Sequence, residues 1–183
     1  MDQSILPVLQ SDNSWGRITD GDGDWAYFLQ PTPNLSNSVE TGYFGFLEMP
    51  ECSHAGGLYP QAFELNLISS DPEAQILYTL DCSVPVLGAP STYIFDPDLP
   101  INIYDRSFEP NEHSMIRSTI PWDGTAQNEQ NAWFPPNGLV RKANVVRYKA
   151  IRPGYLDSEL RTESYLVGNE ALQSYEGSRS YPW

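Results

Sequence analysis

The chain has 183 residues, of which 40% are hydrophobic and 13% aromatic, so it can bury the core of one or two domains. Its formal charge of −14 comes from 24 acidic against 10 basic residues. So acidic a surface repels phosphate backbones and anionic lipids, which argues against a nucleic-acid partner and against binding to anionic membranes.

None of the apolar runs reaches the roughly 20 residues that a membrane-spanning helix needs. Residues 1–15 (MDQSILPVLQSDNSW) contain neither the basic n-region nor the long apolar h-region of a signal peptide. We therefore expect no membrane span and no signal peptide in this chain. Either the protein is cytoplasmic or the chain is a piece of something longer.

The first predicted element is a β-hairpin within residues 14–37, SWGRITDGDGDWAYFLQPTPNLSN. Asp20, Asp22 and Asp24 alternate with glycine there, and Asp-Gly pairs favour tight turns. The alternative is a calcium site, because the three carboxylates could supply some of the roughly six to eight oxygen ligands that Ca²⁺ takes. The EF-hand pattern fails, since Trp25 stands where that loop has glycine and Pro31 where it has glutamate. The turn and the calcium site both stay open, and no other cofactor is expected.

Five short runs follow with strand-like patterning of apolar and polar residues, which is typical of β-strands. In the fourth run, for example, Val146, Tyr148 and Ala150 are expected on one face. The runs are 63–70, 75–80, 99–105, 142–152 and 160–168. The 16 prolines and 13 glycines punctuate the chain, and no stretch of a dozen residues has a clean helical period. We therefore predict an all-β fold, an immunoglobulin- or fibronectin III-like β-sandwich.

Helix content is expected to be small, with a turn or so of helix in residues 169–177. Residues 105–138 form a long polar insertion between two of the predicted strands. Trp122 and Trp133 lie in this insertion and are a candidate carbohydrate-binding platform, because a flat aromatic ring suits the apolar face of a pyranose. The alternative is that both rings fold down onto the core of the sandwich.

The two cysteines, Cys52 and Cys82, could form a disulfide or be ordinary buried hydrophobic residues. His54 lies two residues from Cys52, but nothing in the sequence would orient its imidazole for catalysis. The chain has no G-x-S-x-G, P-loop or G-x-G-x-x-G motif, and neither histidine has a partner at zinc spacing. We predict a region without catalytic activity.

One segment of the chain is basic. We expect it to balance the acidic surface, in part through cross-strand ion pairs. The weaker alternative is that the segment forms a docking site for an acidic partner. Its charged residues are Arg141, Lys142, Arg147, Lys149 and Arg152.

Residues 47–167 contain the segments MPECSHAGGLYPQAFELNL, AQILYTLDCSVP, TYIFDPDLPINIY and VVRYKAIRPGYLDSELRTESYLVG. Together they resemble the immunoglobulin/fibronectin-like domain at the C-terminus of chitobiases and β-hexosaminidases. That family usually has glycine where this chain has Cys82. Because glycine there permits a positive φ, Cys82 must adopt a strained φ or a different turn, and a disulfide with Cys52 could compensate.

Two further segments place this module in a longer arrangement. WFPPNGLVRKANVVRYKAIRPGYLDSE resembles the version of the module that precedes the kinase domain of spore-coat H-type (CotH) proteins. SWGRITDGDGDWAYFLQPTPNLSN resembles the closing strands of a lamin-tail domain. The resemblance implies the end of a lamin-tail-like domain over 1–40, the chitobiase-type module over 47–167 and a linker over 168–183.

These observations predict a non-catalytic accessory or spacer module of a larger secreted or cell-surface bacterial protein. Its partners would be the neighbouring domains of the parent chain and, through weak contact, carbohydrate. One alternative is a carbohydrate-binding module proper. Another is that the chain is the non-kinase portion of a CotH-type protein kinase.

Overall fold

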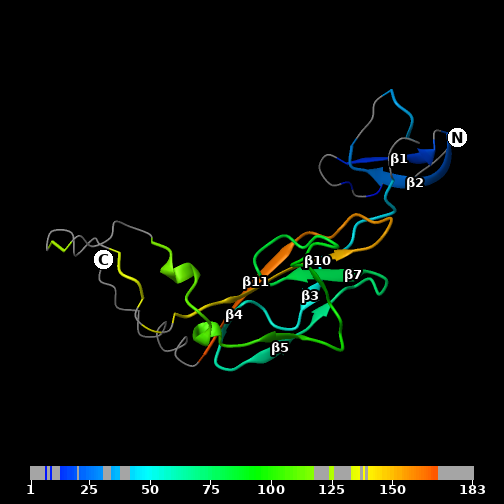
Figure 1. Ribbon diagram of the computed structural model, residues 1–183. Coiled ribbons are helices and arrows are strands. Elements are labelled where there is room, and N and C mark those ends of the chain that lie inside the picture. Colours follow the sequence, from blue (N-terminus) through cyan, green and yellow to red (C-terminus); the bar gives the residue numbers. More distant parts are fainter. Residues whose placement is uncertain are drawn as a thin grey trace, which may run out of the picture. The chain divides into compact units, whose positions relative to one another are not determined.

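The protein is all-β in the computed structural model, as the sequence predicts. The structure describes residues 7, 9, 13–19, 21–30, 34–37, 42–117, 124–125, 133–136, 138 and 140–168. Regular structure in these ranges consists of strands and two short 3₁₀ turns (Figure 1). No helix in these ranges has the length and apolar character needed to cross a membrane. The predicted helical turn at 169–177 and the predicted linker lie outside the described residues, apart from Gly168.

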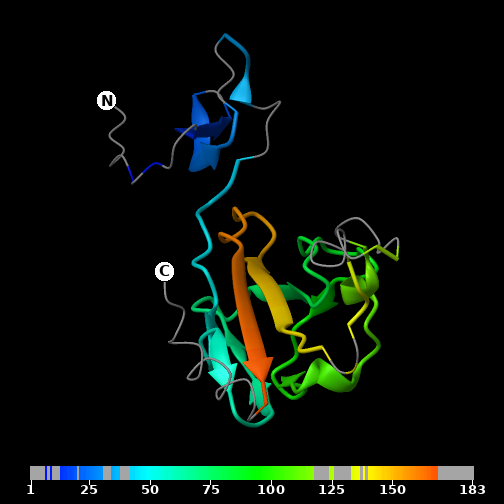
Figure 2. The same cartoon turned by 90° about the vertical axis from the view of Figure 1, so that its left-hand side faces the viewer.

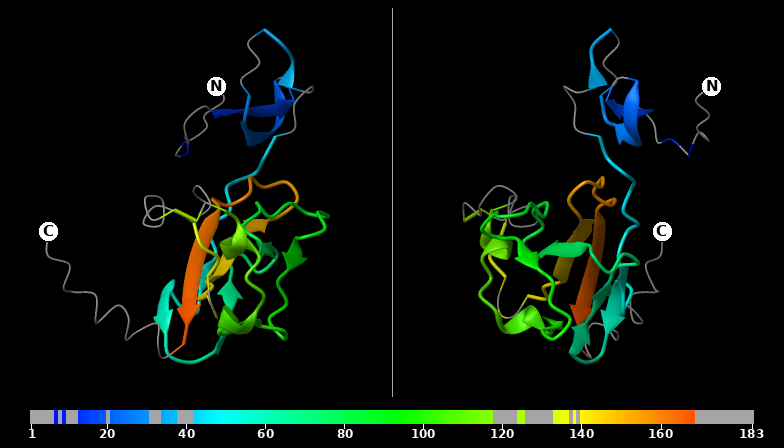
Figure 3. Two further views of the ribbon diagram at one scale, coloured as in Figure 1. Left: turned by 60° about the vertical axis from the view of Figure 1, so that its left-hand side comes forward. Right: turned by 90° about the vertical axis from the view of Figure 1, so that its right-hand side faces the viewer.

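The N-terminal hairpin forms as predicted. Strands β1 (Ser14–Thr19) and β2 (Asp22–Phe28) pair antiparallel (Figure 3). Trp15 lies opposite Tyr27, and Arg17 lies opposite Trp25. Gly21 has a φ of 76°, the left-handed conformation that the sharp turn requires and that glycine adopts without strain. The glycine of the Asp-Gly run therefore supplies the backbone conformation of the hairpin turn.

The largest sheet has five strands in the order β4-β11-β10-β7-β8. Strands β10 (Asn144–Ile151) and β11 (Arg161–Val167) run side by side (Figure 2). Strand β7 (Gln75–Thr79) pairs antiparallel with β10 and with β8 (Tyr93–Ile94), whereas β4 (Gly57–Tyr59) pairs parallel with β11. Within the described residues β8 is therefore an edge strand of this sheet.

Burial along β10 follows the alternation that its sequence predicts. Val146, Tyr148 and Ala150 are fully buried, while the residues between them are half-buried. In contrast, β7 is covered on both faces, because its consecutive residues Ile76 and Leu77 are both buried. A strand that is buried on both sides lies in the interior of a fold, and β7 is an inner strand of its sheet.

Two short strand pairs complete the regular structure. β3 (Glu51–Cys52) pairs with β6 (Leu67–Ile68), and β5 (Phe63–Leu65) pairs with β9 (Ile101–Ile103), all antiparallel. The predicted strand at 63–70 thus forms as two pieces. Both side chains at the ends of β9 are buried and the middle one is exposed, as the alternation predicts.

The chain divides into two compact units, each of which has buried side chains of its own. The first contains the fully buried Leu77 and Tyr148, and the second contains the fully buried Leu65 and Tyr165. The first unit comprises Met1–Ser53, Leu67–Leu99 and Arg147–Thr162. The second unit comprises His54–Asn66, Pro100–Val146 and Glu163–Trp183. The domain boundaries at 1–40, 47–167 and 168–183 stay a prediction.

The described start of the long insertion is held by a polar network. The 3₁₀ turns η2 (Arg106–Phe108) and η3 (His113–Met115) lie here. The ammonium of Lys142 donates to the carbonyl oxygens of Glu109 and Val140 and to Asn111 Oδ1, each at 2.9 Å. The guanidinium of Arg106 binds the Glu109 carboxylate through Nε and Nη2.

Candidate binding surfaces

The predicted calcium ligands lie at the tip of the hairpin. Asp22 and Asp24 are exposed, and Asp20 lies outside the described residues. Asp22 Oδ1 accepts the backbone N–H of Gly23 at 2.7 Å, a local bond of the kind that shapes turns. In the described part of the chain, no group of three or more His, Cys, Asp or Glu residues could hold a metal ion. The calcium site stays a prediction.

The predicted carbohydrate platform is only partly described. Trp133 is half-buried, and Trp122 falls outside the described residues. Whether the two rings form one platform therefore stays a prediction. Instead, the structure brings together two other tryptophans that the sequence analysis did not assign to ligand binding. The rings of Trp15 and Trp25 are nearly parallel, with an interplanar angle of 15° and centroids 6.0 Å apart.

The disulfide between Cys52 and Cys82, one of the two possibilities that the sequence leaves open, is not formed, since both cysteines are free. Cys52 belongs to β3, and Cys82 is exposed in the turn after β7. The backbone of Cys82 has a φ of 66°, so of the two possibilities, a strained φ or a different turn, the residue takes the strained, left-handed φ. The guanidinium Nη1 of Arg147 donates to the carbonyl oxygen of Cys82 at 2.6 Å.

His54 lies in an aromatic cluster. Its ring centroid is 4.4 Å from that of Phe63 and 5.9 Å from that of Tyr59, and its carbonyl oxygen accepts the hydroxyl of Tyr165. These contacts give the side chain a packing role.

Ion pairs in the basic segment support its predicted charge-balancing role. Lys149 pairs with Asp157 at 2.6 Å, and Arg152 pairs with Asp71 at 2.7 Å and also with Glu73. Arg152 also lies over the ring of Tyr155, 4.4 Å from its centroid. Arg152 and Asp71 are far apart in sequence, so this charge balance depends on the fold.

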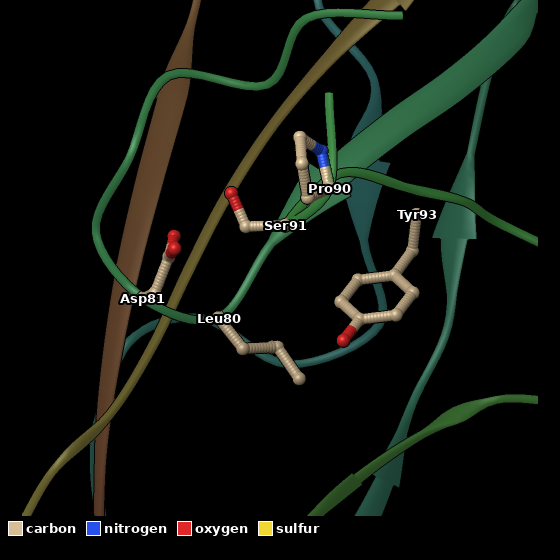
Figure 4. A pocket seen from close by; sticks show the side chains of 5 residues that line it. All are labelled: Leu80, Asp81, Pro90, Ser91 and Tyr93. Carbon is tan, nitrogen blue, oxygen red and sulfur yellow. The ribbon is translucent and has the colours of Figure 1, made fainter. Parts of the chain in front are cut away.

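A pocket of about 370 Å³ opens at the end of β7 and beside β8, and it is lined by Leu80, Asp81, Pro90, Ser91 and Tyr93. In Figure 4, the Leu80 side chain extends toward the ring of Tyr93, while Asp81 and Ser91 place oxygen atoms at the opposite end. The Tyr93 ring is stacked on Tyr78 of β7, with centroids 5.3 Å apart. The pocket therefore has an aromatic and aliphatic wall at one end and oxygen acceptors at the other.

The carboxylate of Asp81 is held by its own turn. Asp81 Oδ1 accepts both the hydroxyl and the backbone N–H of Ser83. These bonds from Ser83, the side-chain bond first, hold the pKa of Asp81 below its usual value. The pocket thus presents an ionised carboxylate at neutral pH.

Apolar side chains of β8 and of the loop between β7 and β8 are exposed. Tyr93 is 51% exposed, Ile94 53% and Leu80 44%. Three further apolar side chains of the loop between β7 and β8 are more than half exposed: Val84, Val86 and Leu87. Isolated exposed apolar residues are common, but a run of them within one short segment, residues 80–94, marks a candidate interaction site. The sequence analysis missed this site because strand β8 has only two residues and shows no period.

Comparisons of the chain with family models, with curated proteins and with solved structures found no match.

Proposed function

We propose that this chain is a non-catalytic accessory module of a larger secreted or cell-surface bacterial protein, and that it docks a partner at the β8 edge. The observation that carries the proposal is the set of exposed apolar side chains in β8 and in the loop that leads to it, together with the pocket beside β8. A catalytic site needs a nucleophile, acid or base oriented by neighbouring groups, whereas a docking surface needs accessible apolar area with a few polar groups. The described surface at β8 has the accessible apolar area and the few polar groups of a docking surface.

The strand order supports an immunoglobulin-like type for this module. The run β11-β10-β7-β8 has the order of strands G, F, C and C′ in a variable-type immunoglobulin domain. In that correspondence β8 is the C′ strand. Immunoglobulin-like modules are frequent in cell-surface proteins, which agrees with a spacing and docking role.

Edge strands suit docking because their outer backbone groups have no partner within the sheet. Among the described strands, β8 is the last one next to β7. It is very short, which limits the affinity of any partner but also protects the free protein from edge-to-edge aggregation. We therefore expect docking of modest affinity.

Selection of random peptides displayed on phage, with the purified chain as the target, tests this proposal. We expect the selected peptides to bind the wild type at least tenfold more tightly than a Tyr93→Ser, Ile94→Ser double variant. Phe108→Ser is the matched control, because Phe108 is an exposed aromatic residue, 77% accessible, in another part of the chain. Circular dichroism would verify that both variants stay folded.

Two results would contradict docking at β8. One is a selection that yields no binding peptide. The other is a set of peptides that bind the double variant as tightly as the wild type.

Carbohydrate contact is a second candidate function, and the Trp15–Trp25 pair favours it. The two half-buried rings are stacked on each other within one hairpin and the Arg17 guanidinium lies 5.1 Å from the centre of the Trp25 ring, so a sugar would stack on the ring faces that these contacts leave open. Titration with chito- and cello-oligosaccharides, followed by tryptophan fluorescence, tests this candidate together with the platform predicted at Trp122 and Trp133. A Trp25→Ala variant assigns any signal to the hairpin. An unchanged spectrum at millimolar ligand would reject the candidate.

A further inference from the structure

Resting on the docking function proposed above, we infer that the partner is an extended basic segment that pairs with β8 and inserts a lysine or arginine into the pocket of Leu80, Asp81, Pro90, Ser91 and Tyr93. Peptides that add a strand to a sheet edge gain affinity from main-chain hydrogen bonds and specificity from pockets for alternate side chains. The β8 edge has both features.

The backbone at Ile94 is turned toward an added strand. The N–H of Phe95 donates to the carbonyl oxygen of Ile76 at 2.8 Å, and Ile94 lies opposite Leu77 in the same antiparallel pair. Antiparallel neighbours alternate between hydrogen-bonded and non-hydrogen-bonded positions. The N–H and C=O of Ile94 therefore point away from β7, where a partner strand can bind them.

The two side chains of β8 determine which side chains of an added strand can pack on each face of the sheet. Consecutive residues of a strand point to opposite faces, so Tyr93 and Ile94 lie on different sides of the sheet. The Tyr93 side carries the pocket with its carboxylate, and the Ile94 side presents an apolar side chain. A matching strand alternates a cationic residue with an apolar residue.

The pocket suits a long cationic side chain. Its volume of about 370 Å³ lies near the lower end of ligand pockets. The aliphatic stem of a lysine or arginine would pack on Leu80 and Tyr93, and its charged group would reach Asp81 and the hydroxyl oxygen of Ser91. The hydrogen bonds from Ser83 both reach Asp81 Oδ1, and Ser91 Oγ also lies 3.1 Å from Ser83 Oγ, so the ligand's cation would bind the remaining lone pairs of this oxygen cluster.

Charge distribution selects a basic partner over a second copy of the chain. Residues 18–105 contain no lysine or arginine, and Asp96 and Asp98 follow β8 directly. Arg147 is near the turn, but its Nη1 donates to the carbonyl oxygen of Cys82. A second copy would bring another net charge of −14, so like charges would oppose self-association.

Synthetic peptides with alternating side chains test this inference. One peptide alternates valine with lysine, a second replaces every lysine by serine, and a third replaces every lysine by glutamate. We expect fluorescence anisotropy at low salt to give at least tenfold tighter binding for the lysine peptide than for the serine peptide, and no binding for the glutamate peptide. Added salt should weaken the lysine peptide most, since it screens the Asp81 pair.

Variants of the protein assign the cation to the pocket. Asp81→Asn should remove the advantage of the lysine peptide over the serine peptide, whereas Glu112→Gln, an exposed acidic residue elsewhere, should leave it intact. Because Asp81 also holds its turn, the Asp81→Asn substitution can change the turn as well as the charge. A second measurement, of backbone amide resonances by NMR, is therefore made on the wild type. There, the lysine peptide should shift the backbone amide resonances of Tyr93 and Ile94.

The outcomes separate this inference from the docking function. If the serine peptide binds as tightly as the lysine peptide, or if selected peptides depend on β8 but carry no basic residue, the basic partner is wrong and docking stands. If no peptide binds and phage selection also yields none, the docking function itself fails.

Discussion

Cys82 has a left-handed backbone conformation that few side chains adopt without cost. We predict that Cys82→Gly raises the free energy of unfolding by about 0.5–1 kcal/mol, because relief of a left-handed strain of about 1–2 kcal/mol exceeds the extra unfolded-state entropy of glycine. Urea denaturation measures the change.

Two controls isolate the backbone effect at Cys82. Cys82→Ala removes the thiol but keeps a Cβ, so its stability should stay within about 0.5 kcal/mol of the wild type. Gly88→Ala reverses the test, because Gly88 has a φ of 82° and an added Cβ would meet nothing within 4 Å. It should destabilise the protein by about 1 kcal/mol. A Cys82→Gly variant that is less stable than the wild type would contradict the claim that the backbone at Cys82 is strained.

Asp71 makes stability depend on pH in the acid range. Its carboxylate accepts the backbone N–H of Glu73 at 2.9 Å and pairs with Arg152, and these bonds, that of Glu73 first, lower its pKa from the ordinary 3.8. A carboxyl group whose pKa falls on folding binds fewer protons in the folded state. Its contribution to stability is therefore complete above the ordinary pKa and is lost as the pH falls below it.

The predicted readout is the difference in unfolding free energy between the wild type and Asp71→Asn across a pH series. The difference should be constant above about pH 5 and should shrink below about pH 4. An Arg152→Met background should reduce this pH dependence, since it removes the hydrogen bond and the charge of Arg152 while the backbone hydrogen bonds to Asp71 remain. A difference that stays constant down to pH 2 would show that the Asp71 pKa is not lowered in the folded state.

At the scale of elements, Lys142 joins the start of the insertion to the chain before β10. Its ammonium donates to three oxygen atoms, on Glu109, Asn111 and Val140. We predict that Lys142→Met lowers the free energy of unfolding by about 2–3 kcal/mol, because a charged hydrogen-bond donor is lost and its acceptors are left without it.

Lys149→Met is the matched comparison for Lys142→Met. Lys149 pairs with Asp157, whose side chain is 48% exposed, and a pair of this kind contributes less than about 1 kcal/mol. Urea denaturation of both variants gives the comparison. Equal losses in the two variants would mean that the Lys142 contacts do not hold the insertion in solution.

At the scale of the whole molecule, the fold class and most of the longer strands could be predicted from the sequence. The run that becomes β10 alternates buried and half-buried residues over its whole length, so its period is readable before folding. Strands β4 and β8 could not be predicted, because two or three residues carry no period and exist as strands only through pairing with β11 and β7. The local sequence pattern therefore predicts the longer strands, whereas the formation of the short strands depends on their pairing within the sheet.

The candidate site was less predictable than the fold. The left-handed conformation of Cys82 was one of the two outcomes expected from the family resemblance, in which glycine is usual at this position. The pocket, in contrast, needs Leu80 from the end of β7 and Tyr93 from β8 to meet, which the sequence does not show. Whether Cys52 and Cys82 form a disulfide could not be predicted for the same reason, since nothing local says whether two thiols approach each other.

The central claim is that an added strand binds the outer edge of β8, and hydrogen exchange at the amide of Ile94 tests it most directly. This amide should exchange rapidly in the free protein, because it points away from β7. Saturation with the valine–lysine peptide, or with a peptide selected on phage, should slow its exchange at least tenfold. Unchanged exchange at Ile94 with the peptide fully bound would contradict strand addition at β8.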